Sequence, residues 1–241
     1  MDAAQPERVS SAVIIGASGG IGRALTEDII ARGRHDVVHA LSRSGISIAG
    51  AESDHIDIED ENSIAAAAKR IGKAETIIVA TGLLHADDYG PEKNRRALNH
   101  DDLMRAFAAN AVGPALVAKH FLPLLPKDAR GVFAALSARV GSISDNRLGG
   151  WYGYRASKAA LNQLIRTLAI ELARQKQDAV CVALHPGTVD TGLSKPFQSN
   201  VADGKLFTPR YAAGKLLSVL DGLTAADTGK IFAWDGQEIA P

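Results

Sequence analysis

The 241-residue sequence has one cysteine, few aromatic side chains and no surplus of charge of either sign. Because one cysteine cannot form an internal disulfide, Cys181 excludes a disulfide framework, and we expect it to be a small core residue. The 27 basic side chains are matched by 27 acidic ones, which argues against nucleic acid or an anionic membrane as a partner. No apolar run approaches the roughly 20 residues of a membrane-spanning helix. The histidines show no metal-ligand spacing, so no metal site is expected.

The amino-terminal segment, residues 1–10, is a polar tail that contains Asp2, Pro6 and Glu7. It has no apolar stretch of the kind that a secretory signal requires. Together with the lone cysteine, this composition predicts a cytoplasmic protein.

Short apolar segments without polar alternation recur along the chain and predict strands that are buried on both faces, as in a parallel sheet. They are Ala12–Gly16, Val37–Leu41, Thr76–Ala80, Val132–Leu136, Val180–Leu184 and Lys230–Trp234, with a weaker one at His55–Ile58. Helical patterns lie between them, at Ile21–Arg32, Ser63–Ile71, Asp101–Leu125, Tyr154–Arg174 and Pro209–Leu220. This alternation predicts a single α/β domain over residues 1–241: a doubly wound, Rossmann-type fold with about seven parallel strands and helices on both faces.

Two segments are rich in loop-forming residues. They are Leu83–His100 and Thr191–Thr208, and the second is expected to be a substrate loop. The helix that follows the first loop is expected to be capped by Asn99 or a nearby aspartate, and to be disturbed at Gly113-Pro114.

A glycine-rich loop follows the first predicted strand and opens a helix. Its cofactor-binding candidates are Gly16, Ser18, Gly19, Gly20, Ile21 and Gly22. Such a loop lets the backbone approach a diphosphate, while the helix amino terminus offers free N–H groups. The same letters also spell the nucleophile elbow of hydrolases around Ser18, but that motif needs strands before it and a histidine near the end of the fold. Only a short tail precedes this strand, so a dinucleotide loop is favoured.

The second predicted strand ends in Ser42-Arg43, where an NAD-binding fold normally has an acidic residue for the ribose diol. Ser42 does not repel a 2′-phosphate, and Arg43 can pair with one. The pair therefore favours NADP over NAD.

A lysine lies on an apolar helical stripe. Tyr154, Lys158, Leu161, Ile165, Leu168 and Leu172 share one face at helical spacing. A charge on such a face is costly unless a partner or ligand receives it. We expect Lys158 to lower the pKa of Tyr154, one turn away, so that the phenol serves as a general acid or base.

Together these residues resemble the short-chain dehydrogenase/reductase family over essentially the whole chain. The motifs that carry the resemblance are Gly16–Gly22, Asp57, Asn110, Gly131–Ser137, Tyr154–Lys158 and Pro186–Thr191. The run from Ser137 to Trp151 is similar to the subgroup of the C-factor (C-signal) signalling proteins and related carbonyl reductases.

The resemblance implies a set of roles for residues of this chain. The catalytic residues would be Asn110, Ser137, Tyr154 and Lys158, with Asn110 holding a water in a proton relay. The further cofactor-binding residues would be Asp57, Ile58, Thr81, Gly82, Pro186, Gly187, Thr188, Val189 and Thr191, besides Tyr154 and Lys158. The implied substrate is a small carbonyl or alcohol, and the implied assembly is a homodimer or homotetramer.

The sequence departs from the family pattern at two places. Val79–Gly82 stands where the family has Asn-Asn-Ala-Gly, so the asparagine contacts are missing. The second residue of the family's Ser-Ser pair is Ala138, which leaves three options: Ser137 turns to the site, Ser142 reaches in, or no hydroxyl polarises the substrate. We assign the role to Ser137.

Two functions fit these features. One is an NADP-preferring oxidoreductase that interconverts a carbonyl and a secondary alcohol. The other is a C-factor-like signalling protein that binds the cofactor with little turnover. Trp151 and Phe197 either wall an apolar substrate pocket or pack against the body of the protein.

Overall fold

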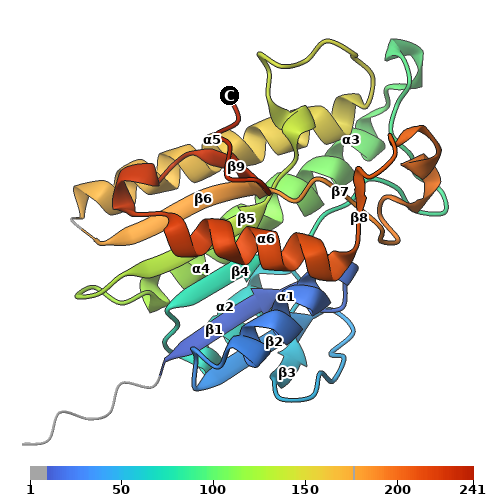
Figure 1. Ribbon diagram of the computed structural model, residues 1–241. Coiled ribbons are helices and arrows are strands. Elements are labelled where there is room, and N and C mark those ends of the chain that lie inside the picture. Colours follow the sequence, from blue (N-terminus) through green and yellow to red (C-terminus); the bar gives the residue numbers. More distant parts are fainter. Residues whose placement is uncertain (1–9, 176) are drawn as a thin grey trace, which may run out of the picture.

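The computed structural model describes residues 10–175 and 177–241 and has a seven-stranded parallel sheet at its centre (Figure 1). The strands are β1 (Ser11–Ile15), β2 (Val37–Ser42), β3 (Glu52–His55), β4 (Thr76–Val79), β5 (Gly131–Leu136), β6 (Ala179–His185) and β9 (Ile231–Ala233). Their order across the sheet is β3-β2-β1-β4-β5-β6-β9, and all six pairings are parallel. The predicted Rossmann-type fold is confirmed. Nine of the ten residues of the expected polar tail, 1–9, lie outside the described residues.

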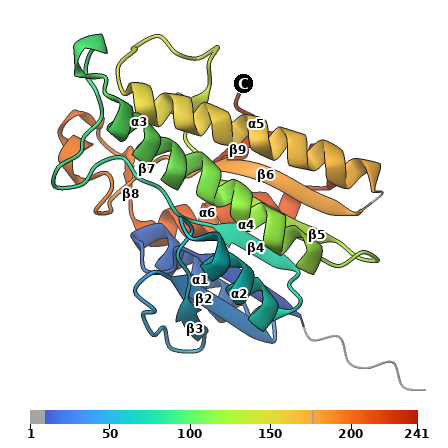
Figure 2. The same ribbon diagram turned by 180° about the vertical axis from the view of Figure 1, so that it is seen from behind.

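Helices cover both faces of the sheet. Helices α1 (Gly20–Arg32) and α6 (Pro209–Gly222) lie on the face seen in Figure 1. Helices α2 (Glu61–Ile71), α4 (Gly113–Phe121) and α5 (Tyr152–Arg174) lie on the other face, which Figure 2 shows. Because side chains alternate along a strand, each central strand contributes to both cores. Cys181 in β6 is fully buried in one of these cores, as expected.

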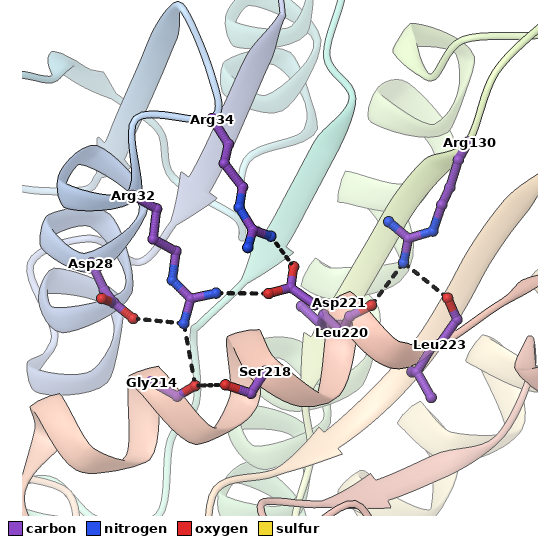
Figure 3. Close-up of polar contacts among 9 residues, drawn as sticks. All are labelled: Asp28, Arg32, Arg34, Arg130, Gly214, Ser218, Leu220, Asp221 and Leu223. Atoms are coloured by element: carbon purple, nitrogen blue, oxygen red, sulfur yellow. Dashed lines mark hydrogen bonds and ion pairs between the residues drawn. The ribbon is translucent and has the colours of Figure 1, made fainter.

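An arginine cluster joins α1 and α6 at the end of the sheet where the strands begin (Figure 3). Arg32 and Arg34 both donate to the Asp221 carboxylate, at 2.9 and 2.8 Å. Arg130 donates to two backbone carbonyl groups at the end of α6. Since the strands are parallel, these contacts leave the opposite end of the sheet open for a ligand.

The third strand lies three residues earlier than predicted: it is Glu52–His55 rather than His55–Ile58. As the edge strand it is polar, because one side of it faces solvent. The apolar signal came from Ile56, which is buried just after the strand ends.

The predicted helix Asp101–Leu125 is not continuous. It consists of α3 (His100–Phe107), a π-helical turn at Ala108–Val112, α4, and a 3₁₀ turn at Leu122–Leu124. The Asn99 side chain accepts a hydrogen bond from Asp102 N at 2.9 Å and caps α3, as predicted. The break occurs in the turn before Gly113-Pro114. π-Helical turns recur at functional sites, and this one contains Asn110.

Both predicted loops contain short regular pieces. The segment 83–100 includes a 3₁₀ turn at Arg95–Ala97. The segment Thr191–Thr208 includes a 3₁₀ segment at Lys195–Asn200 and strand β8 (Leu206–Phe207), which pairs with β7 (Thr188–Val189). In the described part of the chain, no helix has the length and apolar character needed to cross a membrane.

Candidate active site

A cleft of about 360 Å³ opens where strands β1 to β4 end. Nine of its lining residues were predicted from the sequence: Gly16, Ser18, Gly19, Ser42, Arg43, Asp57, Ile58, Thr81 and Gly82. Six others were not singled out: Ser44, Ile56, Glu59, Ala80, Leu83 and Ala109. The missed residues adjoin predicted ones in sequence, so extending each motif by one or two positions would have found most of them.

The glycine loop packs too tightly for side chains. A Cβ on Gly22 would lie 2.2 Å from the carbonyl oxygen of Gly16, and Gly16 itself has a φ of 90°. A Cβ on Gly20 would lie 2.7 Å from Cγ2 of Thr191, so the segment after β6 touches this loop. Helix α1 begins at Gly20 without a side-chain cap. Its first N–H groups remain for an anionic ligand.

The segment after β4 faces the same cleft. The hydroxyl oxygen of Thr81 is buried and has no hydrogen-bond partner among residues 10–175 and 177–241. A buried hydroxyl of this kind is costly unless a ligand satisfies it. Together with the glycine loop, this unpaired group fits a bound dinucleotide that the cleft residues would hold.

Lys158 and Tyr154 lie on the buried face of α5, with exposed fractions of 2% and 8%. The Lys158 ammonium donates to the carbonyl oxygen of Leu136 at the end of β5, at 2.8 Å. Its nitrogen is 5.9 Å from the centre of the Tyr154 ring and lies close to Gly82. The predicted inward position of the lysine, beside the tyrosine and the cleft, is confirmed.

The electrostatics of this pair differ from the expectation. Burial raises the pKa of Tyr154 to about 12 and lowers the pKa of Lys158 to about 7. Low-polarity surroundings penalise both tyrosinate and ammonium. At neutral pH Lys158 is only partly charged, so it does not lower the phenol pKa below its ordinary value. The prediction that Lys158 lowers the pKa of Tyr154 was therefore wrong.

The buried lysine predicts a measurable cost in stability. We expect Lys158→Met to raise the free energy of unfolding at pH 7 by on the order of 2 kcal/mol, because it removes the penalty of the lowered lysine pKa. Between pH 7 and 10 the unfolded chain binds a proton at Lys158 that the folded chain does not, so the contribution of Lys158 to wild-type stability rises with pH. The Met variant lacks this slope. Denaturant titrations at pH 7 and 9.5 measure both effects. If the free energy of unfolding changed equally with pH in the wild type and the Met variant, the pH effect would be contradicted.

The Asn110 side chain hydrogen-bonds to two different segments of the site. Its side-chain oxygen accepts from Leu83 N, and its amide donates to Leu83 O, both at 2.8 Å. The amide also donates to the Ser157 hydroxyl at 3.1 Å. The fully buried asparagine thus ties the segment after β4 to α5.

The hydroxyl groups of the two candidate serines both form hydrogen bonds with other residues of the protein. The Ser137 hydroxyl donates to Asn162 Oδ1 at 2.7 Å, inside the protein, so its single proton is already used. The Ser142 hydroxyl accepts from Asp145 N and lies beside the carboxyl-terminal Pro241. The assignment of the carbonyl-polarising role to Ser137 is therefore not supported by this geometry. Ser137 is buried whereas Ala138 is partly exposed, as expected where side chains alternate in extended backbone.

The segment after β6 reaches the glycine loop through Thr191, but none of its predicted residues lines the cleft. The residues predicted there are Pro186, Gly187, Thr188, Val189 and Thr191. The carbonyl oxygen of Val189 accepts from the Ser194 hydroxyl, and Thr191 touches the glycine loop. This segment therefore links the glycine loop to the 191–208 loop.

Aromatic rings gather beside Tyr154. The Trp151 ring centre lies 6.2 Å from that of Tyr154 and 5.1 Å from that of Phe197. His85 contacts Phe197 edge-on at 5.8 Å, and its Nε2 is 3.0 Å from the carbonyl oxygen of Gly192. The two loops thus meet in an aromatic wall made of Trp151, Phe197 and His85.

Residues 10–202 match the family model of the short-chain dehydrogenases, which spans most of the chain. The chain belongs to the short-chain dehydrogenase family. It is therefore an oxidoreductase, and the hydrolase interpretation of Ser18 is excluded.

Relatives of this short-chain dehydrogenase agree with the assignment. It is 30% identical to a 1-hydroxy-2-glutathionyl-2-methyl-3-butene dehydrogenase of Rhodococcus sp. (strain AD45), over 95% of this chain and 98% of that protein. It is 37% identical to the C-signal protein of Myxococcus xanthus, over 59% of this chain and 80% of that one. The NADPH-bound carbonyl reductase from chicken fatty liver superposes with a TM-score of 0.84 at 25% identity, covering 97% and 95% of the two chains.

Proposed function

We propose that this short-chain dehydrogenase reduces an apolar carbonyl compound to a secondary alcohol, with NADPH as cofactor and Tyr154 as general acid. The observation that carries the proposal is the buried Tyr154–Lys158 pair beside the dinucleotide cleft. A phenol whose pKa is raised to about 12 is protonated at neutral pH. A protonated acid is the form needed to deliver a proton to a carbonyl oxygen.

The nicotinamide, when bound, supplies the hydride. The tyrosine holds the proton at its phenol oxygen and gives it to the substrate oxygen as negative charge develops there. Lys158 would hold the ribose of the bound cofactor through its side-chain nitrogen, and Asn110 keeps the segment after β4 against α5. The aromatic wall places apolar rings beside the phenol.

The preference for NADPH is proposed from Arg43. This exposed side chain lines the cleft beside Ser42 and Ser44, and Ser42 places no carboxylate there. A guanidinium group pairs well with a phosphate. The chicken carbonyl reductase with which the chain superposes holds NADPH.

We expect Arg43→Ala to weaken NADPH binding about tenfold, because an exposed arginine–phosphate pair is lost. The dissociation constant for NADH should change by less than about twofold, since NADH has no 2′-phosphate. Fluorescence titration of each cofactor measures both values. An equal loss for the two cofactors would show that Arg43 does not read the phosphate.

The substrate class follows from the wall of rings next to Tyr154. Trp151 and Phe197 contact each other and are both partly exposed, so they present apolar surface where a substrate carbonyl must lie. The proposal is tested by NADPH oxidation, followed at 340 nm, with a panel of aryl ketones, aliphatic ketones, aldehydes and quinones. Turnover with apolar members supports it.

Two observations favour a second function, a cofactor-binding signalling role with little turnover. Ala138 supplies no hydroxyl, and the C-signal protein is a relative. Losing one donor to the developing oxyanion lowers the rate by about 10²–10³-fold. NADPH binding without turnover across the whole panel would favour this second function and contradict the first.

A further inference from the structure

A buried carboxylate that belongs to none of the site motifs contacts the start of the catalytic helix. Glu92 lies in the segment between β4 and α3, and only 3% of its surface is exposed. Its carboxylate oxygens accept from the backbone N–H of Gly153, at 3.0 and 3.3 Å. Gly153 directly precedes Tyr154, so this contact fixes the turn of α5 that carries the phenol.

Helix α5 needs an acceptor from outside. The first N–H groups of a helix have no intrahelical partner, and a Ser, Thr, Asp or Asn cap normally satisfies one of them. The cap position of α5 is Trp151, which makes no side-chain cap. The carboxylate of Glu92 takes that place from 61 residues away in the sequence.

The same residue holds Trp151 through its backbone. Trp151 N donates to the carbonyl oxygen of Glu92 at 2.6 Å. Among the described residues, Trp151 is the only one other than glycine with a positive φ, at 52°. A bulky residue in the left-handed region is strained and needs its surroundings to keep it there. Glu92 therefore contacts both Trp151 in the aromatic wall and the residue before Tyr154.

The packing around this contact has no spare room. A Cβ on Gly153 would lie 2.9 Å from Glu92 Oε1 and 3.3 Å from the Cβ of Ala106. The helix start therefore touches the carboxylate directly, without space for a water between them. A change in the length of the acidic side chain must move the helix start or break the contact.

We propose that Glu92 is a positioning residue: by capping α5 at Gly153 and holding Trp151, it sets the place of the Tyr154 phenol against the cleft. The inference rests on the proposed function where turnover is concerned. The cap itself is a property of the protein without cofactor and has its own measurement.

The experiment compares Glu92→Gln, Glu92→Asp and Glu92→Ala with Lys93→Ala, an exposed neighbour in the same segment. Amide hydrogen exchange at residues 151–154 is measured in the cofactor-free protein. The exchange of Gly153 should be slow in the wild type, the Gln variant and the Lys93 control. It should be at least tenfold faster in the Asp variant, whose side chain is one methylene too short, and in the Ala variant.

Turnover is measured on the same proteins. The value of kcat should fall at least tenfold for Asp and Ala and stay within about threefold for Gln, with NADPH affinity within about twofold throughout. If the Glu92→Ala variant does not fold, the comparison of kcat and Gly153 exchange between the Gln and Asp variants decides. Better function or protection for Asp than for Gln would assign the effect to charge and overturn the proposal, as would fast Gly153 exchange in the wild type. If no carbonyl is reduced by any protein, the proposed function fails, and the exchange data still decide the cap.

Discussion

Tyr154→Phe is expected to lower kcat for carbonyl reduction by about 10³-fold, because it removes the proton donor and leaves the ring in place. The phenylalanine ring fills the same buried position on α5, so the helix and its packing should not change. NADPH affinity should stay within about threefold, because the glycine loop and the residues after β2 and β4 are untouched. Stopped-flow or steady-state oxidation of NADPH measures the first effect, and fluorescence titration measures the second.

The chain offers a matched control on the same helix. Tyr152 is one of the first residues of α5 and is 39% exposed. Tyr152→Phe removes a phenol from the solvent-facing side and should leave kcat within about twofold. Near wild-type turnover in the Tyr154→Phe variant would show that Tyr154 is not the general acid. A variant that has also lost NADPH binding would point to damage to the cleft instead of to the proton transfer.

The fold and most of the cleft could be predicted because their signals are local in sequence. Buried parallel strands are continuous apolar runs, and the ligand-binding residues follow directly after them. The glycine loop and the inward lysine also depend on short-range spacing alone. Strand β3 was misplaced because an edge strand carries no such apolar run.

The features that the sequence did not predict depend on contacts between distant segments. Glu92 reads as one more acidic residue in a polar loop, and only the fold brings it to Gly153. The destination of the Ser137 hydroxyl depends in the same way on Asn162, which lies one turn beyond Lys158 on α5. The raised pKa of Tyr154 could not be predicted from the sequence either. The spacing shows that a lysine is near the phenol, but it does not show how strongly burial lowers the pKa of that lysine.

The position at which a hydroxyl is missing can be tested by restoring it. We expect Ala138→Ser to raise kcat for carbonyl reduction by between about 10-fold and 100-fold, because a new O–H group would donate to the substrate oxygen as its charge develops. Ala138 follows β5 in extended backbone and is partly exposed, so a serine fits without left-handed strain. Steady-state rates at saturating NADPH measure the gain.

Ser137→Ala separates this position from its neighbour. The Ser137 proton is held by Asn162 inside the protein, so losing that hydroxyl should leave kcat within about threefold and lower the free energy of unfolding by about 1 kcal/mol. The pair of variants therefore has opposite signatures: activity changes at 138, and stability changes at 137. If Ser137→Ala abolished turnover while Ala138→Ser had no effect, the hydroxyl at 137 would be the one that faces the substrate. The bond to Asn162 would then have to break in the working enzyme.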